Sequence, residues 1–169
     1  MTDAILQRTG ERPILRFERH LARPLEDVWH AVTDPEAMRS WFPTRIIIDE
    51  WRVGAPLSHE FEDMDIAPLP GTVLEWEPQR RVAFTWGTDT ITFELRADGD
   101  GTNFVLTEEL GANIAARNAA GWEICLERLE TGTSSDVWKS RFDHYVSVFQ
   151  PVLGPQDGPP ESHQESNYA

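Results

Sequence analysis

The stretch Asn113–Thr131, NIAARNAAGWEICLERLET, decides the fold of this chain. Apolar and small residues recur in it at spacings of three and four, the period of an α-helix, so they share one face of the predicted helix. These residues are Ala115, Ala119, Trp122, Cys125, Leu126 and Leu129. The other face carries the charged residues Arg117, Glu123, Glu127, Arg128 and Glu130. A helix of about 19 residues is roughly 28 Å long, enough to span a small domain.

Gly121 lies in the middle of this predicted helix, where glycine costs roughly 1 kcal/mol relative to alanine. One explanation is that a sheet or loop crosses the helix there too closely for a side chain. Nearly everything before the helix has the pattern of β-strands, which predicts a curved sheet wrapped around it.

The segment before the helix alternates apolar and polar residues, as half-buried β-strands do. The first predicted strand is Ile14–Leu21, in which Arg19 interrupts the apolar side. Two short helices follow: one has Pro24 in its first turn, and the second is capped by Asp34 and starts at Pro35. Further strands are predicted at residues 44–50, 57–62, 72–77, 82–86, 91–95 and 103–110. Short strands at hairpin spacing predict an α+β fold with a curved antiparallel sheet of six to seven strands around a long C-terminal helix.

The length of 169 residues corresponds to one domain. We expect a loose leader at residues 1–12 and a domain at residues 13–150 that includes an added C-terminal helix at residues 135–149. Pro151 ends this helix, and residues 151–169, rich in Pro, Glu, Ser and Gln, form a predicted disordered tail. One face of the added helix is an aromatic stripe of Trp138, Phe142, Tyr145 and Phe149. The stripe could pack on its own domain, bury itself in a homodimer or receive another protein.

The formal net charge of −14, from 15 basic and 29 acidic residues, repels phosphate backbones and anionic lipids. It argues against nucleic-acid binding and against docking on an anionic membrane. No apolar run approaches the roughly 20 residues of a membrane span, and the N-terminus lacks the apolar core of a secretion signal. The single cysteine, Cys125, lies on the apolar helix face, which predicts a buried thiol. Together these features predict a cytoplasmic protein.

Five motifs stand out: PLEDVWHAVTDPEAMRSWF (Pro24–Phe42), VGAPLSHEF (Val53–Phe61), GTVLEWEPQRRVAFTW (Gly71–Trp86), TNFVLTEEL (Thr102–Leu110) and GWEICLERLE (Gly121–Glu130). Together with the order of the elements, they resemble the SRPBCC superfamily of helix-grip proteins, which includes pollen allergens, START lipid-transfer proteins and polyketide cyclases. Within it, the chain is similar to the branch named after activators of the ATPase of the ninety-kilodalton heat-shock chaperone. The resemblance covers about residues 14–131.

The resemblance implies a cavity between the sheet and the long helix, because family members known to bind have one there. It implies no catalytic residues, since the branch shares none. Many relatives have a histidine at the position of Glu108 or its neighbour, whereas this chain has Glu108 and Glu109. The branch name also implies an alternative function as a protein-interaction or chaperone co-factor module with a role in the stress response.

Alternation places a set of apolar residues on the inward face of the sheet, where the helices add further aromatic rings. Because ligand pockets are mostly apolar with a few polar groups, we interpret this set as the wall of a cavity for a small hydrophobic or amphipathic molecule. The alternative is a filled core. The predicted inward sheet residues are Leu57, Phe61, Leu74, Trp76, Val82, Phe84, Trp86, Ile91, Phe93, Leu95, Phe104 and Leu106. The predicted ligand-binding residues are Trp29, Trp41, His59, Phe61, Trp76, Phe84, Trp86, Phe93, Glu108, Trp122 and Leu126.

Two polar residues, His59 and Glu108, fall on the same inward face, where an imidazole or carboxylate needs hydrogen-bond partners. They could orient the polar group of a ligand, or act as base and acid of a cyclase- or hydrolase-like enzyme. Alternatively, both lie near strand ends and contact water. The sequence has no metal-ligand spacing, phosphate-binding loop or nucleophile elbow, so we expect no metal and no cofactor. The sequence thus favours a non-catalytic binding protein.

Overall fold

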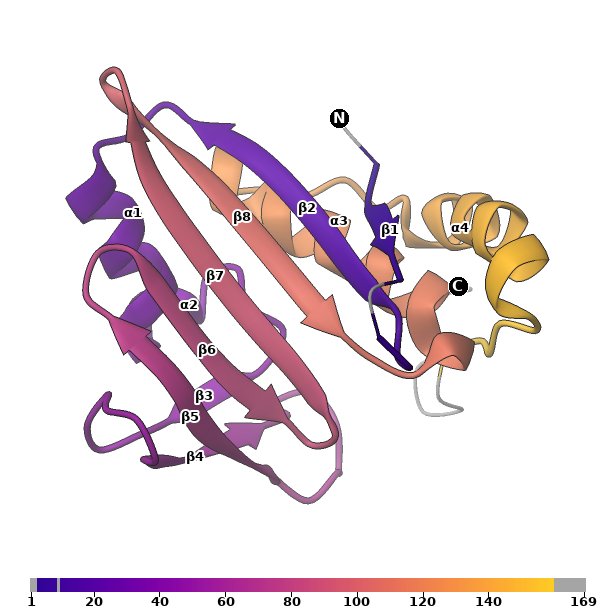
Figure 1. The fold of residues 1–169 in the computed structure, drawn as a ribbon, viewed down its shortest axis with the longest axis horizontal. Helices are drawn as coiled ribbons and strands as arrows, with labels where there is room; N and C mark the ends of the chain where they lie inside the picture. The colour runs from indigo at the N-terminus through magenta and orange to yellow at the C-terminus, as the bar shows by residue number, and fades with distance from the viewer. Residues whose placement is uncertain (1–2, 9, 160–169) are drawn as a thin grey trace.

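The computed structural model describes residues 3–8 and 10–159, which form one antiparallel sheet and the helices around it (Figure 1). Within this described part the sheet has eight strands, slightly more than predicted, in the order β1-β2-β8-β7-β6-β5-β4-β3. The strands are β1 (Ile5–Gln7), β2 (Ile14–Leu21), β3 (Arg45–Ile47), β4 (Pro56–Glu60), β5 (Leu69–Glu77), β6 (Arg81–Trp86), β7 (Asp89–Asp98) and β8 (Gly101–Glu109). The helices are α1 (Leu25–Thr33), α2 (Pro35–Met38), the 3₁₀ turn η1 (Ala112–Ile114), α3 (Ala115–Thr131) and α4 (Trp138–Leu153).

The sheet is curved and holds α3 against its inner face, behind β2 and β8 in Figure 1. The two short helices α1 and α2 lie at one end of the sheet, and α4 lies beyond β1 against α3. Buried side chains of the sheet, of α1 and of α3 meet in one core, which contains Phe17, Val28, Phe93, Phe104 and Leu126. The predicted α+β fold is therefore confirmed, with a long helix inside an antiparallel sheet.

The predicted apolar face of α3 is buried from Ala115 to Leu129, and Cys125 is a buried free thiol. Two details of this helix were predicted wrongly. Glu123, assigned to the solvent face, is buried because the side chains of Arg141 and Tyr145 from α4 bind its carboxylate. Gly121 has no close neighbour: a Cβ atom built there would meet nothing within 4 Å outside its own helix. The glycine at position 121 is therefore not required by a strand or loop that crosses the helix.

The pairing of β5 with β6 contains a register shift between Val73 and Glu75. A bulge adds one residue to a strand, so the alternation of its side chains changes phase. Val73 is buried, Leu74 and Glu75 both face outward, and Trp76 returns to the inner side. Leu74, predicted on the inward face, is instead 44% exposed.

Both ends of the described chain are more ordered than the sequence suggested. Residues Ile5–Gln7, in the predicted loose leader, pair with β2 as strand β1. Helix α4 continues past Pro151 to Leu153, because proline removes only its own donor and the Gly154 N–H still bonds to the Gln150 carbonyl. Residues 154–158 return to the start of α3, where the Gln156 side chain accepts from the Ala116 N–H at 2.9 Å. Residues 160–169 of the predicted tail lie outside the described residues.

The aromatic stripe of α4 packs largely within its own chain. Tyr145 and Phe149 are buried, with ring centroids 5.1 Å apart. Trp138 and Phe142 are half-buried and stack on each other at 5.0 Å. Of the three interpretations of the stripe, packing on its own domain is the one that these contacts support.

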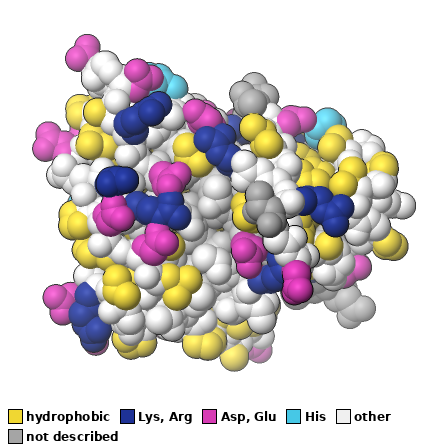
Figure 2. All heavy atoms as spheres, in the orientation of Figure 1, with side chains coloured by type: hydrophobic (Ala, Val, Ile, Leu, Met, Phe, Trp, Pro, Cys, Tyr) yellow, Lys and Arg dark blue, Asp and Glu magenta, His cyan; other side chains and the backbone are white. Residues whose placement is uncertain are grey.

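The outer face of the sheet is covered by interleaved charges, as Figure 2 shows over β5, β6 and β7. Arg81 binds the carboxylates of Glu75 and Glu94, and Arg16 binds Glu18 at 2.8 Å. This face is therefore polar, and the apolar groups concentrate on the inner side. In the described residues no helix is both long and apolar enough to cross a bilayer.

Candidate functional site

The predicted ligand-binding residues do come together on the inner face of the sheet, and their aromatic rings form a continuous cluster. Its ring pairs include Trp29 with Trp76 at 5.2 Å, Phe84 with Phe93 at 5.6 Å and Trp86 with Trp122 at 6.1 Å between centroids. Trp41 and Phe61 join the cluster through Phe93 and Trp86, and Leu126 is buried beside it on α3.

Phe42 lies at the centre of this cluster, although the ligand-binding prediction did not include it. Its ring lies 5.7 Å from that of Trp86, 5.6 Å from that of Trp122 and 6.0 Å from that of Phe84. These are contact distances for aromatic rings. Phe42 therefore occupies the space between the sheet and α3 at this level.

His59 lies on β4 and is fully buried, so the prediction that it faces inward is confirmed and contact with water at a strand end is excluded. Its Nδ1 lies 3.1 Å from the Thr44 hydroxyl, and its Nε2 lies 3.0 Å from the Thr85 carbonyl. A carbonyl only accepts, so Nε2 carries the proton and Nδ1 accepts from Thr44. Burial lowers the pKa of His59, although the bond to Thr85 opposes this shift.

Glu108 lies on β8 and is 1% exposed, so it too faces inward and away from water. The Asn118 amide donates to its Oε1 at 2.9 Å, and the Trp122 indole N–H donates to its Oε2 at 2.7 Å. Asn118 and Trp122 are four residues apart on α3 and so lie on one side of the helix. Burial raises the pKa of Glu108 to about 8, in spite of these two donors.

Asp89, at the start of β7, is the partner of Glu108 that the sequence prediction missed. Its carboxyl group lies near enough to that of Glu108 for each to affect the pKa of the other, and Arg12 Nη2 binds Asp89 Oδ1 at 2.9 Å. Burial raises the pKa of Asp89, and the Arg12 guanidinium opposes that rise. Alternation along β7 from Ile91 back to Asp89 places both on the inner face, so this signal was present in the sequence.

His59 and Glu108 do not form an acid–base pair. The ring of Trp86 stacks on His59 at 5.3 Å, Trp86 contacts Trp122, and Trp122 binds Glu108. Two indoles thus separate the imidazole from the carboxyl group. Each of the two groups is bonded to its own protein partners.

Cys125 is buried on α3, and burial raises the pKa of its thiol to about 12. A thiol is a nucleophile only as the thiolate, so this cysteine is inert at neutral pH. Among the described residues no group of three or more His, Cys, Asp or Glu side chains could hold a metal ion.

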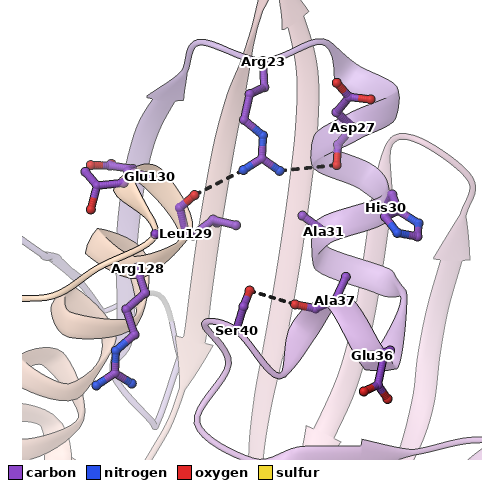
Figure 3. Close-up of a pocket in the computed structure, with 12 residues that line it drawn as sticks. Arg23, Asp27, His30, Ala31, Glu36, Ala37, Ser40, Arg128, Leu129 and Glu130 are labelled. Atoms are coloured by element: carbon purple, nitrogen blue, oxygen red, sulfur yellow. Dashed lines mark hydrogen bonds between the residues drawn. The ribbon is translucent and has the colours of Figure 1, made fainter.

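An open cleft lies elsewhere, between α1–α2 and the last turn of α3 (Figure 3). This cleft encloses about 660 Å³ and is open to solvent. Sequence patterns do not reveal it, because the ends of three separate helices form it. Its lining residues are Arg23, Asp27, His30, Ala31, Glu36, Ala37, Ser40, Arg128, Leu129, Glu130, Thr131 and Gly132.

Arg23 bridges the two sides of this cleft (Figure 3). Its guanidinium donates to the Leu129 carbonyl at 3.3 Å and to the Asp27 carbonyl at 3.5 Å. Arg128, on the α3 side, donates through Nε to the Ser134 hydroxyl at 2.9 Å. A guanidinium has five N–H donors, so both arginines retain donors beyond these bonds. Glu130 is paired with the buried Arg19 on β2 at 3.3 Å, which orders the α3 side of the cleft.

Solved structures with the same fold are similar to this chain over most of its length. The conserved protein of unknown function EF2215 from Enterococcus faecalis has a TM-score of 0.73 and 19% identity, over 88% of this chain and 91% of its own. CalU16 from Micromonospora echinospora has a TM-score of 0.68 and 20% identity, over 89% and 94%. CV1439 from Chromobacterium violaceum has a TM-score of 0.58 and 23% identity, over 72% and 98%.

No curated protein matches the chain. The family model described as "Activator of Hsp90 ATPase homolog 1-like protein" matches residues 22–132, which hold the helices α1 to α3 and the strands β3 to β8. The match takes in every residue that lines the cleft, and also Asp89, Glu108, Asn118 and Trp122. The chain therefore belongs to the Activator of Hsp90 ATPase homolog 1-like family.

Proposed function

We propose that this chain is a non-catalytic binding protein that holds a small amphipathic molecule in the cleft between α1–α2 and α3. The observation that carries the proposal is the cleft itself, because its volume of about 660 Å³ is that of a small-molecule site. Such sites usually measure about 300–1,000 Å³ and combine apolar surface with a few polar groups.

The lining of the cleft suits a molecule with a short apolar body and a polar group. Leu129, Ala31 and Ala37 supply apolar surface from α3, α1 and α2. Arg23 and Arg128 offer hydrogen-bond donors at one side. No side chain in the cleft is placed as a nucleophile with an adjacent base, so binding is the role that this chemistry supports.

The aromatic cluster is the other location for a ligand, as expected from the sequence. Its polar groups, His59 and Glu108, are already bonded to protein partners. A ligand there would have to separate Phe42 from the indoles of Trp86 and Trp122. Binding in the open cleft requires no such rearrangement, which is why we favour the cleft.

The test is a titration with 8-anilinonaphthalene-1-sulfonate and with medium-chain alkyl carboxylates and amines, followed by ligand fluorescence and by calorimetry. In the variant Ala37→Trp an indole fills the cleft, and we expect binding at least tenfold weaker than in the natural chain. The matched control is Ala67→Trp, on the exposed loop between β4 and β5, which should bind normally.

Two results would overturn this assignment. If Trp86→Ala changes the affinity while Ala37→Trp does not, the ligand occupies the aromatic cluster instead. If none of these amphiphiles saturates the protein, the molecule is not a binder of this class.

The family description favours a second candidate, a chaperone co-factor module. The side chains of Val148 and Val152 on α4 are about half exposed and lie one turn apart, and Trp138 at the start of the same helix is half-buried. A partner that docks on α4 should be lost from a pull-down when Trp138 is replaced by alanine. An unchanged pull-down with Trp138→Ala would remove the start of α4 as its docking surface.

A further inference from the structure

The two oxygens of Glu108 attach the first turns of α3 to the sheet. Asn118 binds one oxygen and Trp122 the other, at 2.9 and 2.7 Å, and both donors come from the helix. Glu108 lies opposite Ile91 in the β7–β8 ladder, and Asp89 is two residues before Ile91 on the same face. The cluster thus joins β7, β8 and α3 at a single buried carboxyl group.

The charged groups around Asp89 and Glu108 compensate one negative charge on this pair, but not two. Arg12, from the segment before β2, binds Asp89 at 2.9 Å, and Glu109 lies 4.0 Å from the same guanidinium. Arg117 on α3 acts on Asp89 from a distance and donates to the Gly158 carbonyl at 3.3 Å. Glu108 itself contacts only neutral donors and the Asp89 carboxyl group.

Two neighbouring carboxyl groups in a buried site repel each other when both are ionised, so the site favours one proton on the pair. With Asp89 compensated by Arg12, that proton belongs to Glu108, which is buried and has no cation of its own. Loss of the proton would place two negative charges side by side in a low-dielectric site, where repulsion is strong.

We propose that the Asp89–Glu108 pair is a proton-operated latch. While the pair keeps one proton, the first half of α3 stays on the sheet, and when that proton leaves, this part of α3 loosens. When the latch opens, Trp122 moves away from Trp86 and Phe42. Its ring contacts with these two residues close the aromatic cluster. The start of α3 stays tied to the C-terminal segment through Gln156, so the movement is local.

The proton leaves near the upper end of the physiological range, because burial raises the pKa of Glu108 to about 8. Below this pH the latch is closed. Above it, Glu108 carries a charge that burial keeps from water. The bonds from Asn118 and Trp122 favour this ionised form, but desolvation outweighs them, so the gain in hydration favours movement of α3 away from the sheet.

The test follows the indole N–H of Trp122 by NMR from pH 6 to pH 10. The Trp41 indole, which donates to the Ala31 carbonyl at 2.9 Å, is an internal reference for base-catalysed exchange. We expect Trp122 exchange to accelerate at least tenfold more than Trp41 exchange, with a midpoint near pH 8.

Two variants distinguish the latch from a merely structural bond. Glu108→Gln keeps a donor for Asp89 and cannot ionise, so the extra acceleration should disappear. Asp89→Asn removes the neighbouring charge, so the midpoint should move to lower pH. Parallel exchange of Trp122 and Trp41 in the natural chain, or an unchanged midpoint in Asp89→Asn, would overturn the proposal.

Discussion

His59 is a neutral imidazole built into the core, and its protonation is linked to folding. Burial lowers its pKa in the folded chain, whereas the unfolded chain binds a proton at about 6.5. The unfolded state therefore holds more protons just below that pH, and the free energy of unfolding falls as the pH drops through this window. The slope can reach about 1.4 kcal/mol per pH unit for one proton.

Urea unfolding between pH 5 and pH 7.5 checks this first prediction. His59→Gln removes the titrating ring, so its stability should depend less on pH below about 6.5 than that of the natural chain. His30→Gln is the matched control, because His30 is exposed on α1. If both variants flatten the pH profile equally, His59 is not the source of the acid sensitivity.

At the residue scale, alternation correctly predicted that His59 and Glu108 face inward. It could not give their partners, because Thr85 and Asn118 belong to elements that only the folded sheet brings near. The alternative of strand-end contact with water failed for the same reason: a strand end is exposed only if no other element covers it. Asp89 was predictable from the same alternation but was not identified.

At the element scale, two glycines should respond oppositely to alanine. A Cβ at Gly71 on β5 would lie 2.3 Å from the Thr85 carbonyl oxygen and 2.8 Å from Leu57 Cδ1. Gly71→Ala should therefore cost about 1–3 kcal/mol through overpacking, and should disturb the bond from His59 to Thr85. A Cβ at Gly121 meets no such neighbour, so Gly121→Ala should stabilise α3 by about 0.5–1 kcal/mol.

Urea denaturation midpoints of the two variants check this second prediction, with circular dichroism to confirm native secondary structure. A shift of both midpoints in the same direction would contradict it. A loss of stability in Gly121→Ala would mean that another constraint requires glycine in α3.

The periodicity of apolar residues predicted the positions of the elements. The one residue wrongly placed on the inner face of the sheet, Leu74, lies where a bulge interrupts this periodicity. Across residues 72–77 a strict period of two puts Leu74 beside Trp76. The bulge between Val73 and Glu75 adds a residue and exchanges Val73 for Leu74 on the inner face. Bulges depend on the partner strand, so a pattern read along one strand does not contain them.

At the scale of the whole molecule, the sequence predicted the sheet, the long helix and the added helix, but not how the two chain ends meet. The family model covers residues 22–132, whereas β1 and α4 lie outside it. Their contacts join residues 141 apart, as between Ala4 and Tyr145. Local patterns carry no signal for such pairs. The buried Glu123 was misassigned for this reason, since its partners are on α4.

Tyr145 connects both added elements to the family core. Its hydroxyl accepts from the Ala4 N–H at 2.9 Å and donates to the carboxylate of Glu123 on α3. Burial raises the pKa of this hydroxyl, so it stays protonated and keeps both roles. Removal of the hydroxyl leaves a buried carboxylate oxygen of Glu123 and the Ala4 N–H without this partner. The expected loss of folding stability is about 1–3 kcal/mol.

Tyr145→Phe should therefore lower the free energy of unfolding by about 1–3 kcal/mol while the ring still stacks on Phe149. Hydrogen exchange should rise first in β1, because one of its bonds to α4 is made by this hydroxyl, and less in β7 and β8. Val148→Ala, on the exposed side of α4, is the control and should change stability by no more than about 0.5 kcal/mol. Unchanged exchange in β1 would show that the Tyr145 hydroxyl does not hold the N-terminal strand in the sheet.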